Sequence, residues 1–111
     1  MKPKLLFICT SNLTRSVTGE AIARRAGYEA KSAGTAPHAV VRVSQELIDW
    51  ADTIIVACER TDRHLTYLKE HFNLIGKQVF DLDLADFMYD TPHAPDLVAE
   101  ITTRLKKYIT L

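Results

Sequence analysis

The sequence is poor in cysteine, glycine and proline and has no excess of charge of either sign. Four glycines and four prolines among 111 residues argue against a low-complexity or collagen-like chain. The two cysteines, Cys9 and Cys58, lie far apart and form no C-x-x-C pair, which indicates reduced thiols and not a disulfide framework. Lys plus Arg equals Asp plus Glu at 14 each, so the overall basic excess typical of nucleic-acid-binding proteins is missing.

Long hydrophobic runs are also missing. The apolar run at residues 5–8 is too short for the core of a signal peptide, and no stretch approaches the ~18 apolar residues of a membrane span. We therefore expect a cytoplasmic protein that binds neither membranes nor nucleic acids. The histidines show no metal-ligand spacing and are expected on the surface or in loops, so neither a metal nor another cofactor is predicted; they are His38, His64, His71 and His93.

What is present fits one globular domain over residues 1–111. Hydrophobic residues make up 47% and charged residues 25%, as in ordinary soluble proteins, and a chain of this length forms a core without disulfides or metal. Apolar runs predict strands at residues 5–8, 28–33, 53–58 and 77–82. Apolar positions at helical spacing predict helices at residues 16–26, 43–51 and 61–72 and a last helix beginning near Pro95.

This alternation of strands and helices predicts an α/β fold with a four-stranded parallel sheet flanked by helices. Because crossovers between parallel strands are right-handed, the expected strand order is 2-1-3-4, as in flavodoxin-like folds. Ligands of such sheets bind beyond the carboxyl ends of the strands, near the switch in strand order. The loop after the first strand lies at that place.

That loop has the sequence Cys9-Thr10-Ser11-Asn12-Leu13-Thr14-Arg15-Ser16, a cysteine separated from an arginine by five residues. A loop wrapped at a helix N-terminus presents backbone N–H groups to an anion, and the same donors stabilise a thiolate. The arginine at its end offers a bidentate fork to two phosphate oxygens. The spacing predicts a phosphate cradle with a nucleophile, Cys9, at its floor, Arg15 at its rim, and Ser16 and Asn12 bonded to the thiolate and the loop.

The segment from Leu6 through Ser16, with Glu20-Ala21 and Ser32-Ala33-Gly34-Thr35 further on, resembles the low-molecular-weight protein tyrosine phosphatase family, and most closely its short bacterial branch. The resemblance implies that Cys9 is the nucleophile, that Arg15 binds phosphate, that Ser16 tunes the thiolate and that Asn12 and Ser32 support the loop. It also implies that the remaining loop residues bind the substrate; they are Thr10, Ser11, Leu13 and Thr14. The implied substrate is a phosphorylated protein or a small aryl phosphate.

A phosphatase of this kind also needs a general acid to protonate the leaving oxygen. The resemblance places an aspartate on the loop after the fourth strand, and we assign the role to Asp86, with Asp83 and Asp90 as alternatives. Phe87 and Tyr89, which follow Asp86, are expected to flank an aryl group.

Three other functions fit part of the pattern. A cysteine subunit of a sugar phosphotransferase system shares the predicted fold, but its loop has no closing arginine such as Arg15. A thiol arsenate reductase requires further cysteines to resolve its intermediate, and Cys58 alone makes a poor relay. A non-catalytic module that binds phosphorylated ligands would keep the cradle and lack the acid.

Overall fold

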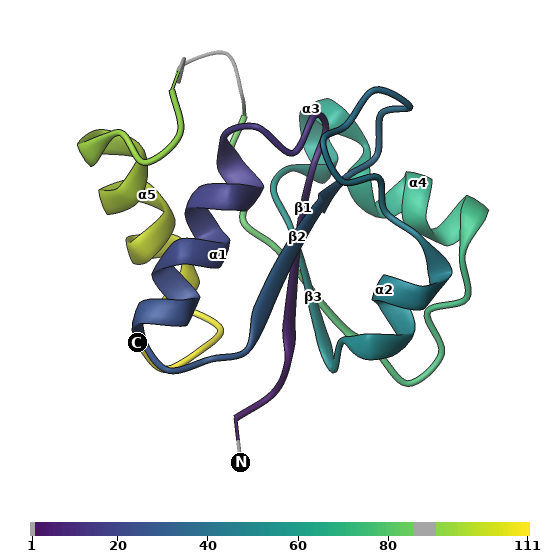
Figure 1. Ribbon diagram of the computed structural model, residues 1–111, viewed down its shortest axis with the longest axis horizontal. Coiled ribbons are helices and arrows are strands. Elements are labelled where there is room, and N and C mark those ends of the chain that lie inside the picture. The colour runs from purple at the N-terminus through teal and green to yellow at the C-terminus, as the bar shows by residue number, and fades with distance from the viewer. Residues whose placement is uncertain (1, 86–90) are drawn as a thin grey trace.

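The computed structural model describes residues 2–85 and 91–111, and its centre is one parallel sheet (Figure 1). The strand order is β2-β1-β3-β4, and every neighbouring pair is parallel, which confirms the predicted fold class and strand order. The strands begin and end within two residues of the predicted bounds; they are β1 (Leu5–Cys9), β2 (Ala30–Gly34), β3 (Thr53–Val56) and β4 (Gln78–Asp81).

The helices form a layer on each face of the sheet, with α1 and α5 on one face and α2, α3 and α4 on the other (Figure 1). The bounds are α1 (Arg15–Arg25), α2 (Gln45–Trp50), α3 (Glu59–Asp62), α4 (His64–His71) and α5 (Pro95–Leu105). The last helix begins at Pro95, as predicted. Gly27 follows the end of α1 with φ 91°, a left-handed conformation that glycine adopts without strain.

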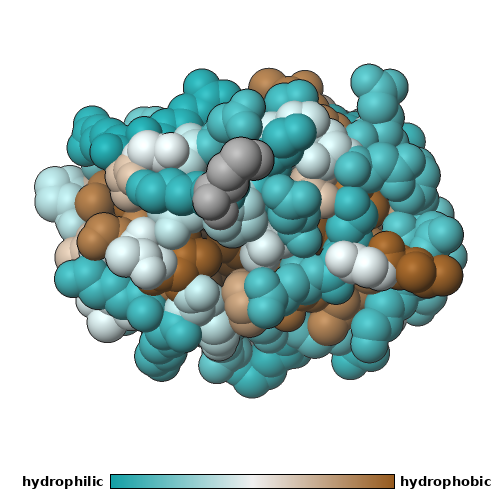
Figure 2. All heavy atoms as spheres, turned by 90° about the horizontal axis from the view of Figure 1, so that it is seen from below, coloured by the Kyte–Doolittle hydropathy of each residue, from teal (hydrophilic) through white to brown (hydrophobic). Residues whose placement is uncertain are grey.

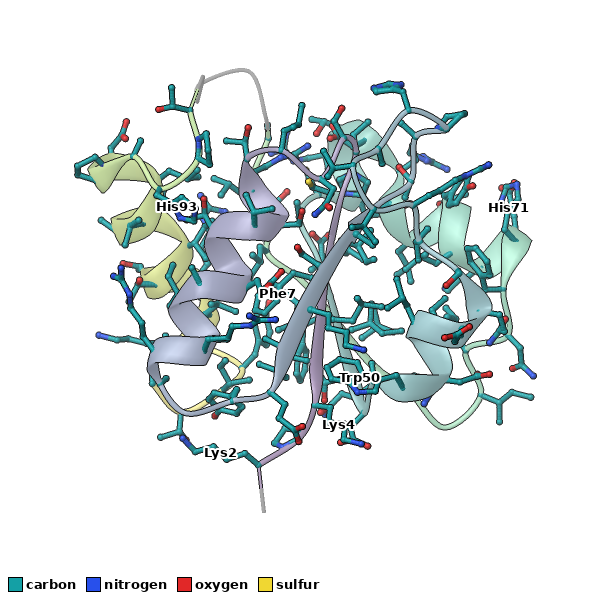
Figure 3. All side chains as sticks on the ribbon, in the orientation of Figure 1. Lys2, Lys4, Phe7, Trp50, His71 and His93 are labelled. Atoms are coloured by element: carbon teal, nitrogen blue, oxygen red, sulfur yellow. The ribbon has the colours of Figure 1, made fainter. Side chains whose placement is uncertain are left out.

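Both faces of the sheet are buried, as the continuous apolar runs predict. On β1, Leu5 and Phe7 face the α1 and α5 layer, whereas Leu6 and Ile8 face the other helices, and all four are at most 1% exposed. The packing is close where α1 crosses β1. A side chain at Gly19 would lie 2.5 Å from the Phe7 ring, which is labelled in Figure 3, so only glycine allows this contact.

The predicted helix at residues 61–72 is wrong in one respect, because the segment forms two helices. The chain leaves the helical conformation at Arg63, whose φ of 58° is left-handed, and α4 starts again at His64. Glu59 stabilises the new start by accepting hydrogen bonds from the Thr66 amide and hydroxyl. The break turns Asp62 and His64 toward the loop after β1.

The opposite end of the sheet is the one where the chain enters β1. Seen from below, this end is mostly hydrophilic, with apolar atoms in separate areas between polar side chains (Figure 2). Trp50 lies here with the Lys4 and Lys31 ammonium groups over its ring, as the labelled side chains in Figure 3 indicate for Lys4. None of the helices in the described ranges has the length and apolar run needed to cross a bilayer.

Candidate active site

The cradle is the turn between β1 and α1. Cys9 is the last residue of β1 and Arg15 the first of α1. The carbonyl groups of Cys9, Thr10 and Ser11 accept hydrogen bonds from the amides of residues 35, 36 and 40, so they point toward the segment after β2. Carbonyl oxygens repel an anion, and this arrangement directs three of them to a neighbouring segment.

The segment after β2 approaches the loop closely at Gly34. A Cβ there would lie 2.4 Å from the Thr10 carbonyl oxygen, a distance that no side chain tolerates, and 3.0 Å from the Asn12 amide nitrogen. The glycine of the Ser32-to-Thr35 segment is therefore required by the contact between the two loops.

A cavity of about 90 Å³ opens inside the loop, and Cys9 is one of the residues that line it. The other residues that line it are Ser11, Leu13, Thr14 and Arg15. Four other predicted residues lie around the loop, with Ser16 on α1 and Ser32 on β2. Thr10, Asn12, Ser16 and Ser32 make hydrogen bonds to one another or to neighbouring elements and do not line it.

Behind the thiol lies a buried set of hydrogen bonds centred on Asn12. The Cys9 thiol donates to Ser16 Oγ at 2.9 Å, and Asn12 Nδ2 donates to the same oxygen at 2.8 Å. With a Cys9 thiolate, rotation of the Ser16 hydroxyl would reverse the first bond, so that the hydroxyl donates to sulfur. Asn12 therefore fixes the oxygen that contacts the nucleophile.

Asn12 also connects the loop to β2 and to the segment that follows it. Its Nδ2 donates to Ser32 Oγ at 3.0 Å, and its Oδ1 accepts from the Val41 amide at 3.1 Å. Ser32 in turn donates to the Glu20 carboxylate on α1. The Asn12 backbone is left-handed, with φ 56°, a conformation that asparagine tolerates better than most residues.

Arg15 is 2% exposed and is held at both terminal nitrogens. One donates to the Leu84 carbonyl oxygen at 2.9 Å, and the other donates to Asp62 Oδ2 at 2.5 Å. Two contacts on different nitrogens fix the plane of the guanidinium. The Leu84 contact also brings the start of the loop after β4 beside the cradle.

Two residues at this site were not predicted from the sequence, Asp62 and His64. The expectation that His64 is a surface or loop histidine is wrong, because its side chain is fully buried. Its Nε2 lies 3.0 Å from Thr10 Oγ1, and its Nδ1 accepts a hydrogen bond from the Cys58 amide at 3.1 Å. The only sequence signal is a polar pair at the start of a helix just after a buried strand, which is common on protein surfaces.

Burial sets the ionisation state of His64. It lowers the pKa of His64 to about 4, and the Arg15 charge contributes, against the opposing charges of Asp62 and Glu59. Burial raises the pKa of Asp62, but hydrogen bonds from Arg15, Thr61 and Thr10 outweigh it and hold that pKa below its usual range. At neutral pH the site therefore contains a neutral imidazole and an ionised carboxylate.

Of the three candidates for the general acid, only one lies within the described residues. Asp83 is described, and its carboxylate forms an ion pair with Arg60 at 2.9 Å; the hydrogen bond from Arg60 lowers the pKa of Asp83, which disfavours a proton donor. Asp86 and Asp90, like Phe87 and Tyr89, lie outside the described residues. Within the described ranges, no group of three or more His, Cys, Asp or Glu side chains is arranged to hold a metal ion.

Comparison with known proteins supports the fold. Neither a protein-family model nor a curated protein matches the sequence. Among solved structures, the tyrosine phosphatase Wzb from Escherichia coli K30, determined in complex with phosphate, is similar with a TM-score of 0.73 and 20% identity, over 97% of this chain and 96% of that one. The fold is therefore the one found in low-molecular-weight phosphatases.

Two further structures show that this fold accommodates different chemistry. The YwlE arginine phosphatase from Geobacillus stearothermophilus is similar with a TM-score of 0.55 and 18% identity, over 99% of both chains. The thioredoxin-dependent arsenate reductase of Corynebacterium glutamicum is similar with a TM-score of 0.61 and 19% identity, over 95% of this chain and 59% of that one. The choice among these activities depends on the site.

Proposed function

We propose that this protein is a cysteine-dependent phosphomonoester hydrolase that acts on aryl phosphates such as phosphotyrosine. The observation that carries the proposal is the cavity at the start of α1, which is lined by both Cys9 and the buried Arg15. The helix N-terminus and the guanidinium both favour an anion there. The similarity in fold to phosphatases supports the same conclusion.

The reaction has two steps. The Cys9 thiolate attacks phosphorus, the bond between phosphorus and the leaving oxygen breaks, and Asp86 gives its proton to that oxygen. The Asp86 carboxylate then takes a proton from water as the water attacks the phospho-cysteine, the P–S bond breaks, and the thiolate returns. Arg15 neutralises charge on the phosphoryl oxygens in both steps. Ser16 stabilises the thiolate as the leaving group of the second step.

The residues around the cavity favour an aryl group. Leu13 lines the cavity and is 55% exposed, so a ring seated beside the phosphate would cover it. Val40, 68% exposed, adjoins the same rim because its amide donates to the Ser11 carbonyl oxygen. We propose Phe87 and Tyr89 as further contacts to the ring. Both cysteines are unpaired thiols, which suits a cytoplasmic enzyme acting on phosphorylated proteins or small aryl phosphates.

The nucleophile is tested by hydrolysis of p-nitrophenyl phosphate, phosphotyrosine peptide and phosphoarginine by the wild type, Cys9→Ser and Cys58→Ser. We expect wild-type turnover of the aryl phosphates without added metal, essentially none with Cys9→Ser, and near-normal turnover with Cys58→Ser, because Cys58 lies outside the cavity. Cys9→Ser should still bind phosphate or vanadate. Full activity of Cys9→Ser, or loss of wild-type activity on adding a chelator, would refute the covalent mechanism. Preference for phosphoarginine would refute the aryl assignment.

The acid is tested by Asp86→Asn, with Asp83→Asn and Asp90→Asn beside it. General acid catalysis contributes ~10²–10⁴-fold, so Asp86→Asn should lower kcat by that order for alkyl phosphates, whose leaving groups are poor. The deficit should shrink with nitrophenolate, a good leaving group. The alkaline limb of the pH–rate profile should flatten in the same variant. If Asp90→Asn or Asp83→Asn shows this behaviour instead, the assignment of Asp86 is wrong.

A further inference from the structure

A second set of polar contacts, partly buried, joins the cradle to α3 and α4, and we call its members, Thr10, Asp62 and His64, the Asp62 network. Thr10 Oγ1 donates to Asp62 Oδ2 at 3.0 Å and lies 3.0 Å from His64 Nε2. The same Asp62 oxygen accepts from Arg15 at 2.5 Å. The network therefore connects α4 to the residue that we propose binds phosphate.

The direction of each hydrogen bond follows from the contacts. Because the Cys58 amide donates to His64 Nδ1, that nitrogen carries a lone pair, and the proton of the neutral ring is on Nε2. His64 Nε2–H therefore donates to Thr10 Oγ1, which leaves the Thr10 hydroxyl proton for Asp62. The donated protons therefore run from His64 to Thr10 and from Thr10 to Asp62, whose carboxylate also accepts the hydrogen bond from Arg15.

The break between α3 and α4 makes this arrangement possible. Residues two apart on a continuous helix point to different sides, so Asp62 and His64 could not both reach Thr10 from one helix. The left-handed Arg63 between them removes this restriction. A left-handed non-glycine residue costs on the order of 1–3 kcal/mol, and such residues cluster at functional sites.

We propose that Asp62, held by Thr10 and His64, is a positioning residue that fixes the Arg15 guanidinium in the orientation that binds the phosphoryl group. This inference rests on the proposed function, because it assumes that Arg15 contacts phosphate. Asp62 holds one terminal nitrogen while the Leu84 carbonyl oxygen holds the other. The guanidinium is then already oriented when the substrate binds, so no rotational freedom is lost at that step. Misplacement of a catalytic contact by about 1 Å costs on the order of 10²-fold in rate.

The proposal predicts different effects for the two simplest substitutions at residue 62. Asp62→Ala removes the acceptor and should lower kcat/KM for p-nitrophenyl phosphate by roughly 10- to 100-fold, mainly through kcat. Asp62→Asn keeps an oxygen that accepts from Arg15 and should lose about tenfold or less. Asp49→Asn is the matched control, since this exposed aspartate lies on α2 and should leave both constants unchanged.

A double-mutant cycle with Arg15→Lys separates positioning from a general loss of structure. If Asp62 acts through the guanidinium, Asp62→Ala should cost less than threefold once Arg15 is lysine. Thr10→Val, which removes only the hydroxyl, should reproduce part of the Asp62→Ala loss, and Thr10→Ser should restore activity. Equal losses from Asp62→Ala in both backgrounds, or equal activities of Thr10→Val and Thr10→Ser, would overturn the proposal.

Titration of each protein with inorganic phosphate distinguishes this proposal from the proposed function. Asp62→Ala should bind phosphate at least fivefold more weakly than the wild type, while its midpoint of thermal unfolding shows that the protein is folded. If the wild type binds phosphate in this Asp62-dependent way but turns over no aryl phosphate, the proposed function fails and the positioning role stands. If aryl phosphates are hydrolysed and Asp62→Ala matches the wild type in kcat/KM and in phosphate affinity, the positioning role fails alone.

Discussion

The two sides of the cradle are held by different kinds of contact. On one side is the Asn12 network, formed by Asn12, Ser16, Ser32 and Glu20, whose hydrogen bonds join neutral side chains near the thiol and end at a carboxylate on α1. On the other side is the Asp62 network, which joins a neutral imidazole, a hydroxyl and an ionised carboxylate to the Arg15 guanidinium. The first supports the nucleophile, and the second supports the cation.

This difference has a consequence for how each side responds to change. The Asn12 side depends on hydrogen-bond geometry and on one left-handed residue, so its loss should appear in stability and in the environment of the thiol. The Asp62 side depends on charge and on the neutral state of His64, so its loss should appear in phosphate binding and in pH dependence. Substitutions on the two sides therefore have different expected signatures.

Among the substitutions that test this comparison of the two networks, Arg15→Lys has the largest expected effect. Lysine keeps the positive charge but cannot reproduce the planar fork or hold both Leu84 and Asp62. Loss of one such transition-state contact costs ~2–4 kcal/mol, so kcat/KM should fall by roughly 30- to 900-fold. Steady-state kinetics measure this loss, with Arg25→Lys at the exposed end of α1 as the control. Near-normal kcat/KM would show that Arg15 has a structural role only.

The Asn12 side is tested by comparing Asn12→Ala with Asn12→Gly. Alanine loses the side-chain hydrogen bonds and is strained at a φ of 56°, so the free energy of unfolding should fall by about 3 kcal/mol. Glycine loses the same bonds without the strain and should be about 1 kcal/mol more stable than alanine. Urea denaturation measures both. If the two variants are equally stable, the left-handed backbone contributes nothing.

The sequence predicted most of the Asn12 network, but of the Asp62 network it predicted only Thr10, as a residue of the loop. Asn12 and Ser16 lie inside the loop with Cys9 and Arg15, and Ser32 was found through a family resemblance, so most of the Asn12 network could be expected. Asp62 lies 47 residues from Arg15 along the chain and reaches it only because β1 and β3 are neighbours and the helix breaks at Arg63. Apolar periodicity predicts a buried helix face, but it gives no sign of a left-handed residue on the polar face.

The same distinction applies to the fold as a whole. Strand order followed from the alternation of strands and helices together with the handedness of crossovers, and both are general properties of parallel sheets. Burial of His64 did not follow, because histidine is found both inside and outside proteins and its partners come from other segments. Its position depends on a backbone amide, that of Cys58, which a pattern of side chains does not reveal.

The smallest effect expected is a pH dependence of stability that belongs to His64. Its pKa is lowered to about 4 in the folded protein and is ~6.5 in an unfolded chain, so the unfolded state binds the proton first as pH falls. Stability from this group is therefore complete only well above pH ~6.5 and declines as the pH falls through ~6.5 toward 4, by about 2 kcal/mol between pH 7 and pH 5. The carboxyl groups with lowered pKa values, such as Asp62 and Glu59, lose their contribution only below their ordinary values near pH 4, outside this window.

Urea denaturation at pH 7 and pH 5 should show this decline in the wild type and in Asn12→Gly. His64→Gln should lack the decline, because glutamine does not titrate. If His64→Gln loses as much free energy of unfolding between pH 7 and pH 5 as the wild type, another group binds the proton. The imidazole beside Thr10 is then not held neutral by burial.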